Sequence, residues 1–324
     1  MAQMAAELGL SRFAVSSVVN GKPQQARLTE STVRRVREHL DRRGYVPSRA
    51  ACDLRSSPTR VVGLLHLGTL NRHLAEAFHL LAESLSGSAS GLEIMVTPGE
   101  QLEPALREMM ARRVTDLVWL HNPSTGERYL EERVANYFKR TRTILYNYPF
   151  NMWPGEKELL ERGVALVGVD RKLQFQRIAR FLKGLGHKVV ALPNVLPSVQ
   201  PCMDAFTSAG LVVADCPLPF KAATLIQAMK HQGVTAAWVN GDNVACQVVD
   251  ELRERGVRIP EDLTVVGFDG MSRVHRQDLT TRVMPVQEMV AKVCEIVAGM
   301  EPELRHCFDM ELVKGQTHGP PRGS

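Results

Sequence analysis

No stretch of the sequence is apolar enough to span a membrane, because none approaches the roughly 18 consecutive apolar residues that a spanning helix needs. The first twenty residues also lack the order of a secretory signal, in which charged residues precede an apolar run. These two absences favour a cytoplasmic protein. The 324 residues, 44% of them hydrophobic, suffice for two or three globular domains with a buried core.

The cysteines lack any close pairing. No CxxC motif occurs, and the spacing indicates no disulfide framework. We expect reduced, mostly buried thiols, as is usual in the cytoplasm. The six positions are Cys52, Cys202, Cys216, Cys246, Cys294 and Cys307.

Signatures of catalysis are missing as well. There is no Walker A or GxSxG sequence, and the GLG at residues 184–186 lacks the rest of a dinucleotide fingerprint, so it is better explained as a helix end before a strand. His73 and His79 are six residues apart and do not share a helix face, so they indicate no metal site. No nucleophile, base and orienting group can be assigned to one site. We therefore expect no enzyme, no cofactor and no metal.

What the sequence does contain is a strong asymmetry of charge. Residues 1–60 carry eleven Lys or Arg and five Asp or Glu, a net charge of +6, which leaves −1 for residues 61–324. A basic first fifth of the chain is typical of binding to a polyanion such as a nucleic acid. The alternative is an exposed helix face on which several arginines meet only solvent.

The order of elements in residues 1–46 favours the nucleic-acid interpretation. Good helix formers precede Gly9, which predicts a short helix that ends at this glycine. Ser11 can cap a second helix by accepting a backbone hydrogen bond. The apolar side of that helix is formed by Ala14, Val15, Val18 and Val19. The residues expected to face largely elsewhere are Arg12, Phe13, Ser16, Ser17 and Asn20.

A third helix begins at Thr29 or Ser31 and would bury Val33, Val36 and Leu40 against the first two. This arrangement is a helix-turn-helix headpiece, in which the second helix enters a major groove and offers its first side chains to base edges. A small structural three-helix bundle is the alternative.

The sequence also resembles a known protein family, and the resemblance extends beyond the headpiece. The runs MAAELGLSRFAVSSVVN, LTESTVRRVREHLDRRGYVPSRAACDLRSS, VVGLLHLG and GVRIPEDLTVVGFD resemble the LacI/GalR family of bacterial transcription regulators. The likeness covers almost the whole chain. It implies a DNA-binding homodimer of the repressor type, with two doubly wound lobes of the periplasmic-binding-protein type behind the headpiece.

The resemblance implies roles for residues of the second helix. Arg12 and Phe13 would read base edges, Arg12 by pairing with a guanine and Phe13 by contact with a thymine methyl. Ser17 stands where the family has an arginine, so the operator is expected to differ from a typical family site. Ser11, Ser16 and Asn20 more plausibly bind phosphates or cap helices. Further DNA contacts are assigned to Tyr45, Arg49 and Leu54.

Residues 47–58 are similar to the family's hinge. Pro47 excludes a helix immediately before it, and Ser48 can cap a short segment that ends at Leu54. The resemblance implies that this segment orders on the operator, pairs with its dimer mate and inserts Leu54 between base pairs in the minor groove. The alternative is a linker whose Leu54 packs on the protein's own core.

After Pro58 apolar runs alternate with helical ones, which predicts parallel sheets covered on both faces. The expected strands are residues 61–67, 92–96, 116–120, 142–146, 165–169, 188–192, 236–240 and 263–268. The expected helices include residues 72–85, 103–112, 172–185, 224–232 and 243–255. The fold class is therefore α/β, with an N-terminal all-α headpiece and two doubly wound lobes.

The expected division places the headpiece at residues 1–46, the hinge and linker at 47–58, the core at 59–318 and a tail at 319–324. Within the core, one lobe takes residues of about 59–186 and 284–302, and the other about 187–283 and 303–318. No leucine-rich tail follows residues 310–317, so dimers without further tetramerisation are expected.

Candidate effector ligands lie where strands end, because open parallel sheets bind ligands at the carboxyl ends of their strands. Asp170, Asp242 and Asp269 hold such positions, and they match family sites that accept sugar hydroxyls. An acid at a strand end is as often a helix cap. Cys202 and Gly241 replace a family arginine and asparagine, so the small-molecule effector is either unusual or no longer bound.

Two alternatives to an effector-controlled, sugar-responsive repressor stay open. The first is a DNA-binding regulator that no longer senses a small molecule. The second is a transport-type solute-binding protein, against which the basic headpiece argues.

The substitution Leu54→Ala tests whether Leu54 acts as a wedge, that is, whether its side chain inserts between two base pairs. If Leu54 opens a base step, the substitution weakens specific DNA binding much more than non-specific binding, because only the specific complex is kinked. Titrations of both complexes measure the two losses. Equal losses would show that Leu54 is not a wedge.

Overall fold

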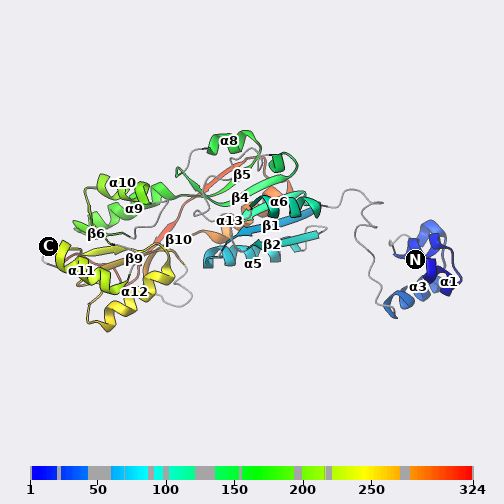
Figure 1. Cartoon of the computed structure of the whole chain (residues 1–324), viewed down its shortest axis with the longest axis horizontal. Helices are drawn as coiled ribbons and strands as arrows, with labels where there is room; N and C mark the ends of the chain where they lie inside the picture. The colour runs from blue at the N-terminus through cyan, green and yellow to red at the C-terminus, as the bar shows by residue number, and fades with distance from the viewer. Residues whose placement is uncertain are drawn as a thin grey trace. The chain divides into compact units, whose positions relative to one another are not determined.

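The computed structural model describes residues 2–19, 23–42, 60–68, 70–86, 91–97, 102–120, 136–152, 155–192, 199–214, 216, 221–270 and 278–322. The chain forms two compact units, Met1–Thr59 and Arg60–Ser324. Figure 1 shows the helical first unit and the α/β second unit. This division separates the expected headpiece and linker from the expected core.

In residues 2–19 and 23–42 of the first unit, four short helical elements surround a small core. They are α1 (Ala2–Leu8), α2 (Arg12–Val19), the 3-10 helix η1 (Pro23–Ala26) and α3 (Glu30–Arg42). Gly9 takes a φ of +66° between α1 and α2, where a residue other than glycine would be strained. Val15 and Val36 are fully buried against each other's helices. The predicted apolar side of α2 is therefore confirmed.

The second unit begins with a sheet that holds six strands in the order β11-β5-β4-β3-β1-β2. Every neighbouring pair in it is parallel. The strands are β1 (Val61–Leu67), β2 (Gly91–Thr97), β3 (Asp116–Leu120), β4 (Arg142–Phe150), β5 (Ala165–Asp170) and β11 (Arg305–Phe308). Its helices are α5 (Arg72–Ser86), α6 (Leu102–Ala111), α8 (Glu156–Glu161) and α13 (Val286–Ala298).

Two apolar clusters cover the two faces of this sheet. Side chains of α5 and α13 pack on one face, and those of α6 and α8 pack on the other. All seven residues of β1 are buried as a result. This is why the strand is a continuous apolar run in the sequence rather than an alternating one.

A second sheet has the order β12-β10-β9-β8-β6-β7 and is parallel except for the pair of β12 and β10. Its strands are β6 (Val189–Ala191), β7 (Val212–Ala214), β8 (Ala236–Trp238), β9 (Thr264–Asp269), β10 (Thr280–Val283) and β12 (Glu311–Val313). Its helices are α9 (Arg171–Gly184), α10 (Val199–Ser208), α11 (Ala222–Gln232) and α12 (Asp242–Glu254). In Figure 1, α9 and α10 lie on one side of the sheet, and α11 and α12 lie on the other.

The boundaries between the two lobes differ from those expected. Strand β11 pairs with β5 in the first sheet, although residues 303–308 were expected in the second lobe. Helix α9 packs against α10, so the second lobe begins near residue 171 rather than 187. The strands β7, β10, β11 and β12 were not among the expected strands.

The chain therefore passes between the sheets three times, after β5, after β10 and between β11 and β12. The side chain of Arg282, at the end of β10, is buried where these passages meet. Its Nη2 atom donates to Gln174 Oε1 of α9 at 2.6 Å and to the carbonyl oxygen of Met310, which precedes β12. One guanidinium thus connects all three passages.

Strand β4 is longer than expected and contains a bulge. Its register against β5 shifts between Tyr146 and Tyr148, and Asn147 between them has a φ of +66°. Gly168 of β5 faces the bulge, and a Cβ atom there would lie 2.0 Å from the carbonyl oxygen of Tyr148. Only glycine allows the two strands to approach this closely.

None of the helices in the described residues combines the length and the apolar character that a membrane span requires.

Gly168→Ala should destabilise the core by about 3 kcal/mol or more, the upper end of the usual cost of overpacking, because the new methyl group overlaps a backbone carbonyl. Chemical denaturation of the core transition measures the change. Gly184→Ala is the control, since a Cβ there meets nothing within 4 Å and alanine favours the helix. Equal stability of the two variants would contradict the close approach.

Candidate functional site

The first turn of α2 presents two side chains outward. Arg12 is exposed, and Phe13 is 61% exposed. Ser11 precedes them and caps the helix by accepting a hydrogen bond from the backbone nitrogen of Ala14 at 3.0 Å. The cap fixes where the helix begins, so it also fixes where Arg12 and Phe13 lie.

Ser17 does not lie on the exposed side of α2 as expected. It is 5% exposed, and its Oγ donates to the carbonyl oxygen of Phe13 at 2.8 Å. A small side chain bonded to its own helix packs against the headpiece core, whereas Ser16 is half-buried. The other DNA residues expected from the sequence, Asn20, Tyr45, Arg49 and Leu54, lie outside the described residues.

The first unit, Met1–Thr59, carries several exposed arginines. They are Arg12, Arg27, Arg34, Arg35, Arg37 and Arg42. Three of them bond within the headpiece: Arg35 to the carbonyl oxygen of Leu8 at 3.2 Å, Arg42 to that of Glu38 at 3.3 Å, and Arg34 to the Glu38 carboxylate at 4.0 Å. Exposed ion pairs of this kind contribute little to stability, so the arginines keep their charge available to a polyanion.

The four expected effector residues have different surroundings. Asp170 caps α9: its Oδ1 accepts from the backbone nitrogen of Leu173 at 2.8 Å, and its Oδ2 accepts from Asn151 Nδ2 at 2.6 Å. This is the helix-cap role that the sequence left open. Asp269 is half-buried at the end of β9, with an unusual φ of +100°.

Asp242 and Cys202 are both enclosed by the protein. Asp242 is fully buried, and its Oδ1 accepts from Thr281 Oγ1 at 2.6 Å and lies 2.3 Å from the position of a Cβ on Gly267. Cys202 lies in the apolar core, where burial raises the pKa of its thiol. The expectation that both meet an effector is not supported by this burial.

Arg171, the first residue of α9, was not among the effector residues expected from the sequence, although it directly follows Asp170. It is 8% exposed, and its Nη2 donates to Asn147 Oδ1 at 3.3 Å. Burial lowers the pKa of Arg171 to about 10, and the nearby carboxylate of Asp269 opposes this change. Asn147 follows the expected strand 142–146, so the strand-end rule would have found it.

His73 lies beside Arg171 from the other lobe. Its helix α5 is capped by Asn71, whose Oδ1 accepts from the backbone nitrogen of Leu74 at 3.1 Å. His73 is 5% exposed, and burial, followed by the charge of Arg171, lowers its pKa to about 3. The imidazole is therefore neutral at physiological pH.

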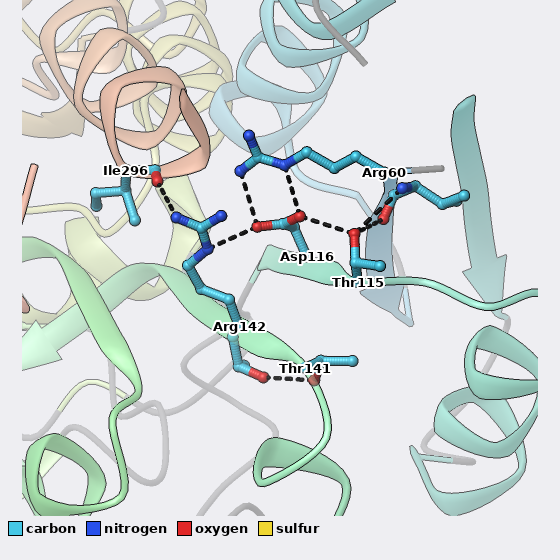
Figure 2. A network of polar contacts seen from close by, with 8 residues as sticks. Arg60, Thr115, Asp116, Thr141, Arg142 and Ile296 are labelled. Carbon is cyan, nitrogen blue, oxygen red and sulfur yellow. Dashed lines mark hydrogen bonds and ion pairs between the residues drawn. The ribbon is translucent and has the colours of Figure 1, made fainter. Parts of the chain in front are cut away.

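A separate network fixes the start of β1, where the core follows the linker (Figure 2). Nε and Nη2 of Arg60 donate to the two carboxylate oxygens of Asp116 at 2.9 and 3.0 Å. Arg142 Nε donates to Asp116 Oδ1 at 2.7 Å, and its Nη1 donates to the carbonyl oxygen of Ile296 at 2.8 Å. The network joins β1, β3, β4 and the last turn of α13.

The Asp116 carboxylate is ionised in this network. Burial alone would raise its pKa, but hydrogen bonds from Arg60 and Thr115 and the charge of Arg142 lower it below its ordinary value. Its side chain is 3% exposed, whereas those of Arg60 and Arg142 are 33% and 42% exposed. The carboxylate is thus the buried centre of a partly exposed cluster.

Comparisons with known proteins agree with this architecture. Residues 162–315 match the model of a periplasmic binding protein-like domain. The sequence is 24% identical to an HTH-type transcriptional regulator from Mycolicibacterium smegmatis, over 99% of this chain and 96% of that protein.

Two solved structures have the same fold. A transcriptional regulator of the LacI family from Silicibacter pomeroyi gives a TM-score of 0.74 at 18% identity, over 97% of both chains. The lac repressor dimer bound to operator and the anti-inducer ONPF gives 0.66 at 19% identity, also over 97% of both chains.

The chain is similar to regulators of the LacI/GalR family in sequence and in fold. The resemblance and the two-lobed α/β class expected from the sequence are thereby confirmed. The lobe junction, where the end of β9 and the start of α9 meet α5, holds Arg171 and His73, two residues that no motif in the sequence had indicated.

His73 should make the core sensitive to acid. In the unfolded chain His73 has its ordinary pKa of 6.5, whereas in the folded chain burial lowers the pKa of His73 to about 3. The free energy of unfolding therefore falls as the pH decreases through this window, by up to about 1.4 kcal/mol per pH unit. Denaturation of the wild type and of His73→Leu at several pH values measures the difference.

His79→Leu is the matched control on the same helix, because the His79 side chain is 78% exposed. It should keep the wild-type slope between pH 6.5 and 3. A wild-type slope in His73→Leu would show that the burial of His73 is not the cause.

Proposed function

We propose that the protein is a sequence-specific DNA-binding transcription regulator of the repressor type, controlled by a small-molecule effector. The observation that carries this proposal is the capped first turn of α2, which presents Arg12 and Phe13 outward from a helix-turn-helix unit. A long cationic donor can pair with a guanine, and an exposed ring can contact a thymine methyl.

The charge distribution supports the same function. Residues 1–60 carry a net +6 and residues 61–324 carry −1, so attraction to phosphates is concentrated in the headpiece unit. A homodimer would place two such headpieces on the halves of a near-palindromic operator. The lac repressor dimer bound to operator, with which this chain shares its fold, is consistent with that arrangement.

The lobe junction is proposed as the effector site. Asp269 and Arg171 meet there at the end of β9 and the start of α9, and a carbohydrate-related molecule is the family's usual effector. Binding that changes the angle between the lobes would alter operator affinity, typically by 5–150-fold in such systems.

A regulator that no longer senses a small molecule is the second candidate. It is favoured by the burial of Cys202 and Asp242, two of the four positions at which ligand contacts were expected. A ligand-induced rise in the melting temperature would exclude this candidate.

Selection of bound sequences from random duplex DNA tests the proposed function directly. The purified full-length protein should enrich a near-palindrome, and footprinting should show a protected centre. No enriched sequence at moderate salt would reject sequence-specific binding.

Arg12→Ala should relax the preference at one base pair of each half-site, because a bidentate arginine contributes about 1–3 kcal/mol of discrimination. The selected-site profile of the variant measures the change. Arg180→Ala removes an equal charge from the exposed surface of the core and should leave the profile intact. An unchanged profile in Arg12→Ala would show that Arg12 does not read a base.

A further inference from the structure

Three neighbouring buried side chains at the lobe junction have polar nitrogens without a hydrogen-bond partner among the described residues. The atoms are Nε of Arg171, the two ring nitrogens of His73, of which one is a donor in the neutral ring, and Nε1 of Trp238. The exposed fractions of these residues are small: 8% for Arg171, 5% for His73 and 3% for Trp238. Bulk water therefore does not form hydrogen bonds with these buried nitrogens. Unsatisfied buried donors are rare in folded proteins and require an explanation.

The three side chains belong to one contiguous place. The charge of Arg171 acts on His73, and the guanidinium of Arg171 lies 5.7 Å from the ring centroid of Phe268. That ring in turn lies 5.8 Å from the ring of Trp238. The elements involved are α5 of the first lobe, β8 and β9 of the second, and the start of α9 between them.

The positive charge of Arg171 is only partly compensated. Its desolvation on burial outweighs the effect of the Asp269 carboxylate, and at neutral pH the guanidinium still carries its proton. His73 is neutral and adds no charge. A buried charge is costly unless an opposite charge and hydrogen bonds satisfy it, so this place favours a negative group.

The backbone around Arg171 is also held in unusual conformations. Asn147 has a φ of +66° in the β4 bulge, and Asp269 has a φ of +100°. Bulges re-aim side chains next to functional sites, and strained residues cluster there. The bulge, which Gly168 allows, brings the Asn147 amide to within hydrogen-bonding distance of Arg171.

We propose that the lobe junction binds a small organic anion, whose carboxylate or phosphate accepts hydrogen bonds from Arg171 with His73 and Trp238 as neighbouring donors. The inference rests on the proposed function only in taking this junction as the effector site. A neutral polyol fits less well, because it adds no charge opposite to that of Arg171, and both carboxylate oxygens of Asp170 are already bonded to Leu173 and Asn151.

Three probes with one carbon skeleton test the charge requirement: glucose, gluconate and glucose 6-phosphate. Calorimetry and thermal shift on the full-length chain should show at least one anion binding about tenfold or more tightly than glucose. The better anion distinguishes a carboxylate from a phosphate ligand. Equal or tighter binding of glucose would overturn the proposal, and so would the failure of both anions at millimolar concentration.

Arg171→Gln keeps hydrogen-bonding capacity without the charge and should weaken binding of the preferred anion by about tenfold or more. Arg180→Gln, on the exposed side of the same helix α9, is the control and should bind as the wild type does. If Arg171→Gln does not fold, Trp238→Phe retains the aromatic packing but loses the N–H donor, and it should still weaken binding several-fold. Wild-type affinity in a folded Arg171→Gln, or in Trp238→Phe when Arg171→Gln does not fold, would overturn the proposal.

Operator selection with the wild-type chain separates the two hypotheses. If an anion binds but no operator is enriched, the proposed DNA-binding function fails while the ligand inference stands. If an operator is enriched and neither anion binds, the ligand inference alone fails.

Discussion

Arg282 lies where the chain passes three times between the two sheets, and its side chain bonds to two passages while its backbone belongs to the third. It is 6% exposed, and burial lowers its pKa, an effect that the nearby Asp309 carboxylate opposes. Removing one partner of a buried charged group usually costs far more than an exposed ion pair gains. The geometry of the lobe junction therefore depends on this one guanidinium.

Contiguous contacts run from these passages to the start of the core. Helix α13 begins directly after the passage at Pro285, and the carbonyl oxygen of Ile296 in its last turn accepts from Arg142. Arg142 shares the Asp116 carboxylate with Arg60, the first residue of the core unit. The proposed regulation of DNA binding from the lobe junction needs such continuity within the core, because coupling is carried by packed and hydrogen-bonded elements.

The headpiece and the lobe junction meet opposite physical requirements. In the headpiece, Arg12 and Phe13 are exposed, as their proposed contact with another macromolecule requires, and a small core around Val15 is enough to hold the helix. At the junction, Arg171 and His73 are buried, as the proposed binding of a small ligand by enclosure requires. One chain thus combines an exposed charged surface with a buried charged site.

The sequence by itself determined most elements and the headpiece core. Strands β1 and β3 have the expected bounds, and Val36 is buried as expected, because periodic or continuous apolar runs report burial directly. Only the tertiary structure decided which polar residues at strand ends are enclosed. Asp242 is sealed against Gly267 and Thr281, and Arg171 is buried beside Asn147, because burial and partners depend on elements far apart in the sequence.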